Sequence, residues 1–143
     1  MSVTASGICF IAYEKMMINS AALSFEVETN KLALVTDSHT PNFDTDATWT
    51  NTNETAGGSW SAGGIALTGT EITTSAGTAK FDATDMSQAT STVSAAMAGR
   101  LYAAAVSDEE LLVVDFIAAV TTVSGTLTIT WNASGIYTND LTP

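Results

Sequence analysis

The feature that most constrains the fold is a series of short apolar–polar alternations running along most of the chain. At residues 126–131, Leu127, Ile129 and Trp131 alternate with threonines, and a two-residue period is typical of β-strands. Turn-forming residues interrupt such segments about every 8–12 positions, which indicates about seven or eight short strands. The sequence therefore predicts a mostly β fold, namely a single-domain antiparallel β-sandwich or barrel-like fold over residues 1–143.

The individual strands follow from the alternation and from the turn signals between them. Glycine, asparagine, aspartate and serine clusters mark turns at 75–77, 82–85, 107–110, 124–125 and 132–135. Between these signals the alternating segments from which these seven or eight strands are expected to form lie at 25–29, 32–36, 65–72, 79–81, 90–94, 100–106, 111–118, 126–131 and 136–141. The segment 65–72 is expected as one strand or as a bulged pair broken near Gly69.

Two segments depart from this pattern. Residues 7–23 have apolar side chains about one helical turn apart, so residues 1–23 are predicted to form an N-terminal arm or helix, with a strand over 8–12 as the alternative. Residues 37–60 form a long polar segment that contains Phe43, Trp49 and Trp60. Because aromatic residues are rare in disordered segments, we expect a packed loop with or without a short helix, or an arm that contacts a neighbour.

The charge of the chain excludes several classes of partner. It has 15 acidic and four basic residues and a net charge of −11, whereas nucleic-acid and anionic-lipid binding depend on Lys and Arg. We therefore expect no nucleic acid and no membrane as partner. Only 13% of the residues are charged, against about 25% in ordinary domains. This favours a homo-oligomer or a larger assembly over a monomer with a neutral Thr- and Ser-rich surface.

The sequence gives little sign of export or of a redox centre. Cys9 is the only cysteine, which excludes a disulfide within the chain. The start of the chain lacks the basic and apolar regions of a signal peptide, and the longest apolar stretch, 111–120, is interrupted by Asp115 and falls short of the ~20 residues of a membrane span. We expect a soluble protein made in a cytoplasm.

The residues that could carry chemistry form no recognisable catalytic arrangement. His39 follows Asp37 and Ser38, but side chains of neighbours in an extended segment point apart, which argues against a triad. Asp44 and Asp46 could offer oxygen ligands to Ca²⁺ but lack the rest of an EF-hand loop. We therefore predict no catalytic residue, no metal site and no cofactor. A solvated acidic loop is the simpler interpretation of the two carboxylates.

Several segments together resemble a known family. They are LALVTDSHTPNFDTDATW at 32–49, AGGIALT at 62–68, AKFDATD at 79–85, LLVVDF at 111–116 and GTLTITWNASGIYTNDL at 125–141. Their order is similar to that in small structural proteins encoded among the head and tail genes of tailed bacteriophages. The loop of that family often reads Thr-Pro-Asn-x-Asp-Thr-His, and Asp46 stands here in place of the histidine.

The resemblance implies a virion component made in the bacterial host cytoplasm, most simply a capsid decoration or cement protein. Its partners would be the major capsid protein or other virion subunits, and it would form a homo-oligomer, a trimer being one option. The interface residues that we expect are Phe43, Trp49 and Trp60 in the loop and Phe10 and Tyr13 in the N-terminal segment. The alternatives are a tail, neck or fibre-associated protein, a carbohydrate-binding module that stacks sugars on Trp49 and Trp60, and, last, a hydrolase with a carboxylate pair.

Overall fold

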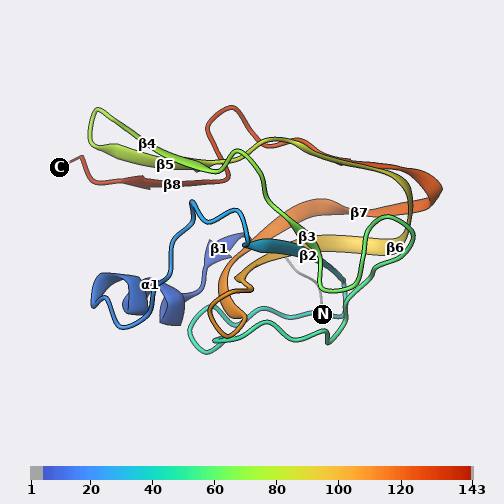
Figure 1. The fold of residues 1–143 in the computed structure, drawn as a ribbon, viewed down its shortest axis with the longest axis horizontal. Coiled ribbons are helices and arrows are strands. Elements are labelled where there is room, and N and C mark those ends of the chain that lie inside the picture. The colour runs from blue at the N-terminus through green and yellow to red at the C-terminus, as the bar shows by residue number, and fades with distance from the viewer. Residues whose placement is uncertain (1–4, 143) are drawn as a thin grey trace.

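The computed structural model describes residues 5–142, and it consists mostly of β-strands with one short helix. In chain order the elements are β1 (Gly7–Ile8), α1 (Phe10–Met17), β2 (Lys31–Thr36), β3 (Ile65–Ala66), β4 (Glu71–Ser75), β5 (Thr78–Asp82), β6 (Met86–Ala103), β7 (Glu109–Ile129) and β8 (Tyr137–Asp140). The strands form two antiparallel sheets, β1-β7-β6-β2-β3 and β4-β5-β8 (Figure 1). Neither sheet closes into a barrel. The predicted mostly β, antiparallel architecture is therefore confirmed in a form compatible with a sandwich.

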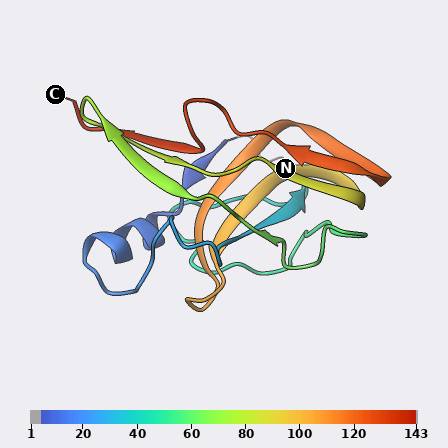
Figure 2. The same cartoon turned by 45° about the horizontal axis from the view of Figure 1, so that its top comes forward.

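The hairpin of β6 and β7 dominates the molecule, with strands of 18 and 21 residues. The sequence predicts two strands, 90–94 and 100–106, where β6 forms, and two more, 111–118 and 126–131, on either side of a turn at Ser124 where β7 forms. In the structure β6 and β7 are each continuous. Ser124 has a φ of 49°, and the register between the two strands shifts repeatedly. Bulges bend a strand and increase its twist. The hairpin accordingly curves, and its far half runs back toward the three-stranded sheet (Figures 1 and 2).

The core lies between the two halves of this bent hairpin and the elements packed on them. Leu34 of β2, Leu101 of β6 and Leu111 of β7 contribute from the first sheet, and Phe81 from β5. The far half of the hairpin adds Met86, Val93 and Leu127. Each fully buried side chain of this size stabilises the fold by about 1.5–3 kcal/mol relative to an exposed one.

The N-terminal segment is only partly helical. Residues 7–8 pair with β7 instead of opening the helix, and the helix ends at Met17, just before Asn19 with its φ of 52°. An ion pair between Lys15 Nζ and Glu109 Oε1, 2.7 Å apart, fixes α1 to the start of β7. The expectation of one helix over 7–23 is therefore too long at both ends, and residues 1–4 of the predicted arm lie outside the described residues.

The expected strand at 25–29 does not form. Phe25 is buried, and its ring lies 4.9 Å from that of Phe81, so the segment is held by packing on β5. The side-chain amide of Asn30 donates to the carbonyl oxygen of Ser24 at 2.8 Å and closes the turn. Tertiary contacts have overridden the local alternation here.

The predicted long loop contains neither helix nor regular strand, and it packs against β2, β6 and β7 of the same chain. Isolated bridges join Glu54 to Val35, Thr48 to Glu109 and Gly58 to Ser91. Gly58 has a φ of 63°, and a Cβ atom there would lie 2.1 Å from the carbonyl oxygen of Thr90. The loop therefore follows the surface of β6 closely because a glycine permits that approach.

Candidate interaction surface

The far half of the β6–β7 hairpin is uncharged. Residues 86–99 and 116–139 contain no Asp, Glu, Lys, Arg or His, in a chain whose net charge is −11. Three branched apolar side chains of β7 are exposed in this region: Ile117 (85%), Val123 (80%) and Val120 (36%). Single exposed apolar residues are common, but a group of them without surrounding charge indicates a protein contact surface.

A wide bulge in β7 creates this exposure. Ala98 pairs with Asp115 and Ala96 pairs with Val120, so residues 116–119 lie opposite Met97 alone. Ile117 has a φ of 67°, a conformation that β-branched residues rarely adopt. Asp115 Oδ1 accepts the backbone N–H of Ile117 at 2.8 Å and holds the bulge in place. The bulge turns Ile117 away from the core.

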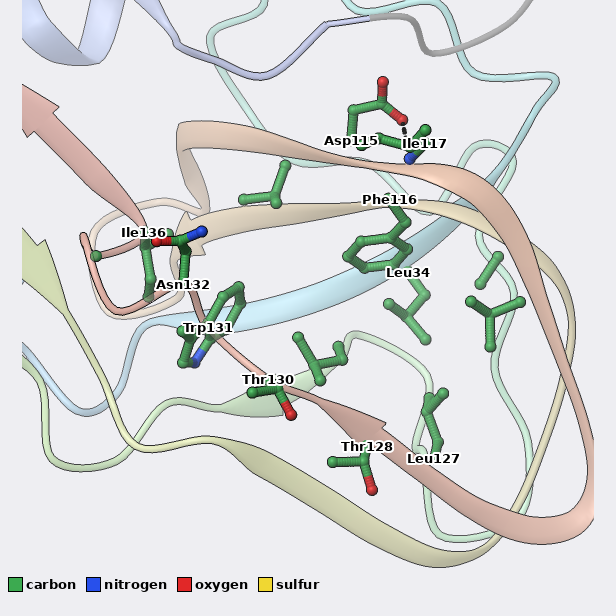
Figure 3. Close-up of a pocket in the computed structure, with 15 residues that line it drawn as sticks. Leu34, Asp115, Phe116, Ile117, Leu127, Thr128, Thr130, Trp131, Asn132 and Ile136 are labelled. Atoms are coloured by element: carbon green, nitrogen blue, oxygen red, sulfur yellow. Dashed lines mark hydrogen bonds between the residues drawn. The ribbon is translucent and has the colours of Figure 1, made fainter.

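A cavity of about 510 Å³ lies on the inner side of the bulge. Figure 3 shows Phe116 pointing into it toward Leu34, while Asp115 and Ile117 lie on the other side of the strand. Most of the rest of the lining comes from the end of β7 and the segment after it, including Leu127, Trp131 and Ile136. Trp131 is fixed there because its Nε1 donates to the carbonyl oxygen of Thr84 at 3.2 Å. The region therefore combines an apolar hollow with exposed apolar side chains.

The outer edge of β7 is also open. Strand β1 pairs only with Leu112 and Val113, and beyond Val113 no strand among residues 5–142 lies along this edge. The corresponding edge of β6 is covered in part, since Thr92 donates its N–H to the carbonyl oxygen of Gly57 at 2.9 Å. Proteins usually protect long edges with charges, and residues 116–139 carry none. We refer to residues 114–123, with the adjoining cavity, as the β7 edge surface.

The structure does not bring the five expected interface residues together. Trp60 has no exposed surface and belongs to the core, and Trp49 is 9% exposed. Phe43 packs against Gly7 and the small cluster around Val35. Only the N-terminal pair lies on an accessible element: Phe10 is 61% exposed and lies 6.5 Å from Tyr13 on α1. As they lie here, Trp49 and Trp60 cannot stack on a sugar ring from solution.

Sequence reasoning missed the β7 edge surface because a predicted strand at 111–118 does not indicate which of its apolar side chains are exposed. Residues 111–113 are indeed buried, but exposure begins at Ile117. One signal in the sequence could have pointed to it. The absence of charge from 116 to 139 is unusual in so acidic a chain, and a surface without charge is more easily covered by a neighbour.

A second, polar cavity of about 500 Å³ lies under the long loop. Threonines line much of it, together with His39, Asp46 and Arg100. The guanidinium of Arg100 is buried and binds both carboxylate oxygens of Glu110, with Nε to Oε1 at 2.7 Å. It also lies 5.6 Å from the centre of the Trp49 ring. Burial acts to lower the pKa of Arg100, but the hydrogen bonds and charge of Glu110 raise it above its ordinary value.

Neither of the two candidate chemistries is assembled in this loop. Nε2 of His39 is buried and has no hydrogen-bond partner among the described residues, so it is not held against a serine. Asp46 Oδ2 accepts the backbone N–H of Asn42 at 2.8 Å, and Asn42 Oδ1 accepts that of Asp44 at 3.2 Å. These groups brace the loop itself. Within residues 5–142 no three His, Cys, Asp or Glu side chains converge as metal ligands would.

His39 should make the stability depend on pH. Burial, and then the charge of Arg100, lower the pKa of His39 from 6.5. The unfolded chain therefore binds a proton near pH 6.5 that the folded chain does not bind, and the free energy of unfolding should fall as the pH decreases below about 6.5. Urea denaturation between about pH 7.5 and 5.5 should show this slope. His39→Gln should flatten it, since the chain has no other histidine; an unchanged slope would contradict the assignment.

Comparison with models of protein families, with curated proteins and with solved structures finds no match for this chain. The one helix of the described residues, α1, is far shorter than a membrane-spanning helix. The surface must therefore be interpreted from its own geometry.

Proposed function

We propose that this chain is a non-enzymatic structural subunit of a tailed-phage virion, and that it decorates or cements the assembled capsid. The observation that carries the proposal is the β7 edge surface, with Ile117 and Val123 about four-fifths exposed on an uncharged, open strand edge. Such a surface is typical of a contact with another protein. The order of segments from 32 to 141 that resembles phage structural proteins supports the virion setting.

The distribution of charge supports a position on the outside of a particle. Acidic residues are absent from residues 86–99 and 116–139 and are carried by the rest of the chain, so the protein would be repelled by packaged DNA. A subunit that binds only the assembled shell stabilises that shell by mass action. The partners would be the major capsid protein or other virion subunits, reached through protein contacts.

Replacement of Ile117 by aspartate should reduce co-sedimentation with assembled shells about tenfold or more, a difference of about 1.4 kcal/mol. The substitution places a charge at the centre of the β7 edge surface. It should leave the fold intact, because aspartate adopts a positive φ more readily than isoleucine does. The measurement is the fraction of protein that pellets with purified shells across a range of concentrations.

Ile72→Asp is the matched control. Ile72 lies on β4 and is 41% exposed, so the same change of side chain is made away from the β7 edge surface. It should pellet like the unmodified chain. Failure of the unmodified chain to bind shells would reject the capsid role. Binding to isolated tails or fibres, without binding to shells, would assign the protein to that part of the virion.

A further inference from the structure

We infer that the partner of the β7 edge surface is a second copy of this chain, paired antiparallel along β7 about a twofold axis at Val120. This inference rests on the proposed function and names the partner of the same surface: the shell would bind a pair of chains, so a variant that separates the pair would also bind the shell more weakly. Its first support is the open edge. Beyond Val113 no strand among the described residues pairs with the outer edge of β7. The N–H groups of Asp115 and Ile117 are bound by Ser6 Oγ and Asp115 Oδ1, and another extended strand would satisfy the outward groups that follow them.

The charge distribution selects a second copy as that strand. Two chains that each carry a net charge of −11 repel one another, so self-association is least opposed where neither contributes a charge. Residues 86–99 and 116–139 meet that condition. A basic partner would find only Asp115 at this edge, and one oxygen of that carboxylate already accepts the N–H of Ile117. The uncharged edge of one copy is therefore best matched by another uncharged edge, such as the same edge of a second copy.

A twofold interface would also bury the open edge and its exposed apolar side chains at the same time. In a symmetric pair, the same patch of each copy contacts its equivalent, so both open edges and both sets of apolar side chains are buried together. Val120 also lines the apolar cavity. A strand laid along this edge would therefore lie beside the opening of that cavity.

The exposed side chains set the register. With the axis at Val120, Ile117 of one copy lies opposite Val123 of the other, which pairs the two most exposed branched side chains of β7. Asp115 then lies opposite Gly125, so the two Asp115 carboxylates are at opposite ends of the interface. Apolar cross-strand pairs stabilise a sheet, and like charges directly opposite destabilise it. A register shifted by several residues would lose the first pairing, and a shift of the axis toward Asp115 would also bring the carboxylates closer.

Cysteine cross-linking tests this register directly. Across an antiparallel twofold, equivalent Cα atoms lie about 4.5–5.5 Å apart, within the range of about 4.4–6.8 Å that a disulfide spans. Val120→Cys should therefore give a covalent dimer under mild oxidation, seen on a non-reducing gel. Cys9, the only native cysteine, is fully buried, and burial raises the pKa of its thiol, so it should remain unreactive.

Val27→Cys is the matched control, because Val27 is 39% exposed and lies in the turn before β2. It should give at least tenfold less cross-linked dimer than Val120→Cys. Adding Ile117→Asp to Val120→Cys should reduce cross-linking by a similar factor. Light scattering of the unmodified protein should give the mass of two chains.

The outcomes separate this inference from the proposed function. A monomeric mass, with equal cross-linking of Val120→Cys and Val27→Cys, would overturn the inference even if the chain bound shells. A dimer that Ile117→Asp leaves intact and that does not cross-link through position 120 would also overturn it, because another surface would then hold the pair. A dimer that cross-links as expected but does not pellet with shells would support the inference and reject the capsid role.

Discussion

Replacement of Arg100 by methionine should lower the free energy of unfolding by about 3–5 kcal/mol. Glu110 has no exposed surface, and both of its carboxylate oxygens are bound by Arg100. Without the guanidinium, a buried carboxylate would lose its partner while remaining out of water. Since small domains are stable by only about 5–15 kcal/mol, the change should be plain in urea denaturation at neutral pH.

Two further variants make the cause specific. Arg100→Met combined with Glu110→Leu removes both charges and should recover more than half of the loss, because an apolar pair often replaces a buried ion pair at little cost. Lys80→Met breaks the more exposed pair of Lys80 with Asp82, 3.1 Å apart, and should cost about 0–1 kcal/mol. If Arg100→Met proved no more destabilising than Lys80→Met, the buried pair would not be the element that joins β6 to β7 here.

The strands could be predicted from the sequence, but the way in which they join could not. Alternation at 126–131 reports the local two-residue period of a strand, and that prediction is confirmed by β7. A serine–glycine pair normally signals a turn, yet Ser124 and Gly125 continue the strand opposite residues 91–93. Whether a positive φ produces a turn or a bulge depends on which strand lies alongside, and that partner is distant in sequence.

The limits of the N-terminal helix show the same dependence on distant contacts. The periodicity of 7–23 correctly indicates a helix but does not locate its ends. Gly7 and Ile8 pair with residues 112–113 of β7, more than a hundred positions away. Lys15 likewise finds its partner in Glu109. Nothing near residue 7 in the sequence records these contacts.

The candidate surface was the hardest feature to predict. The composition suggests contact with neighbours, since charge is scarce, but it does not say where. Aromatic residues are the usual anchors of interfaces, which favoured Trp49 and Trp60 in the loop. Both are instead buried beneath that loop, while small branched residues are exposed at the bulge. A sequence shows that Ile117 is apolar, whereas its exposure follows from a bulge that only the pairing of β6 with β7 creates.

Trp60→Ala should therefore lower the free energy of unfolding by about 3–5 kcal/mol, the range for a large aromatic side chain removed from a core. Trp60→Phe should cost clearly less, because the ring is largely replaced and Nε1 of Trp60 has no hydrogen-bond partner to lose within the described residues. Phe10→Ala, at a position 61% exposed, is the control and should change stability by at most about 0.5 kcal/mol. Thermal or urea denaturation measures all three.

The same three variants separate a core residue from an interface anchor. An anchor that inserts into a neighbour would leave the isolated chain about as stable after truncation and would reduce only its assembly. If Trp60→Ala behaved in that way, the loop from 37 to 60 would have to open on assembly. The interface would then be assigned to the loop and not to the β7 edge surface. If it unfolds the chain while Ile117→Asp leaves the fold intact and abolishes assembly, stability and assembly reside in different residues. That outcome is the one expected from a fully buried indole and an isoleucine that is 85% exposed.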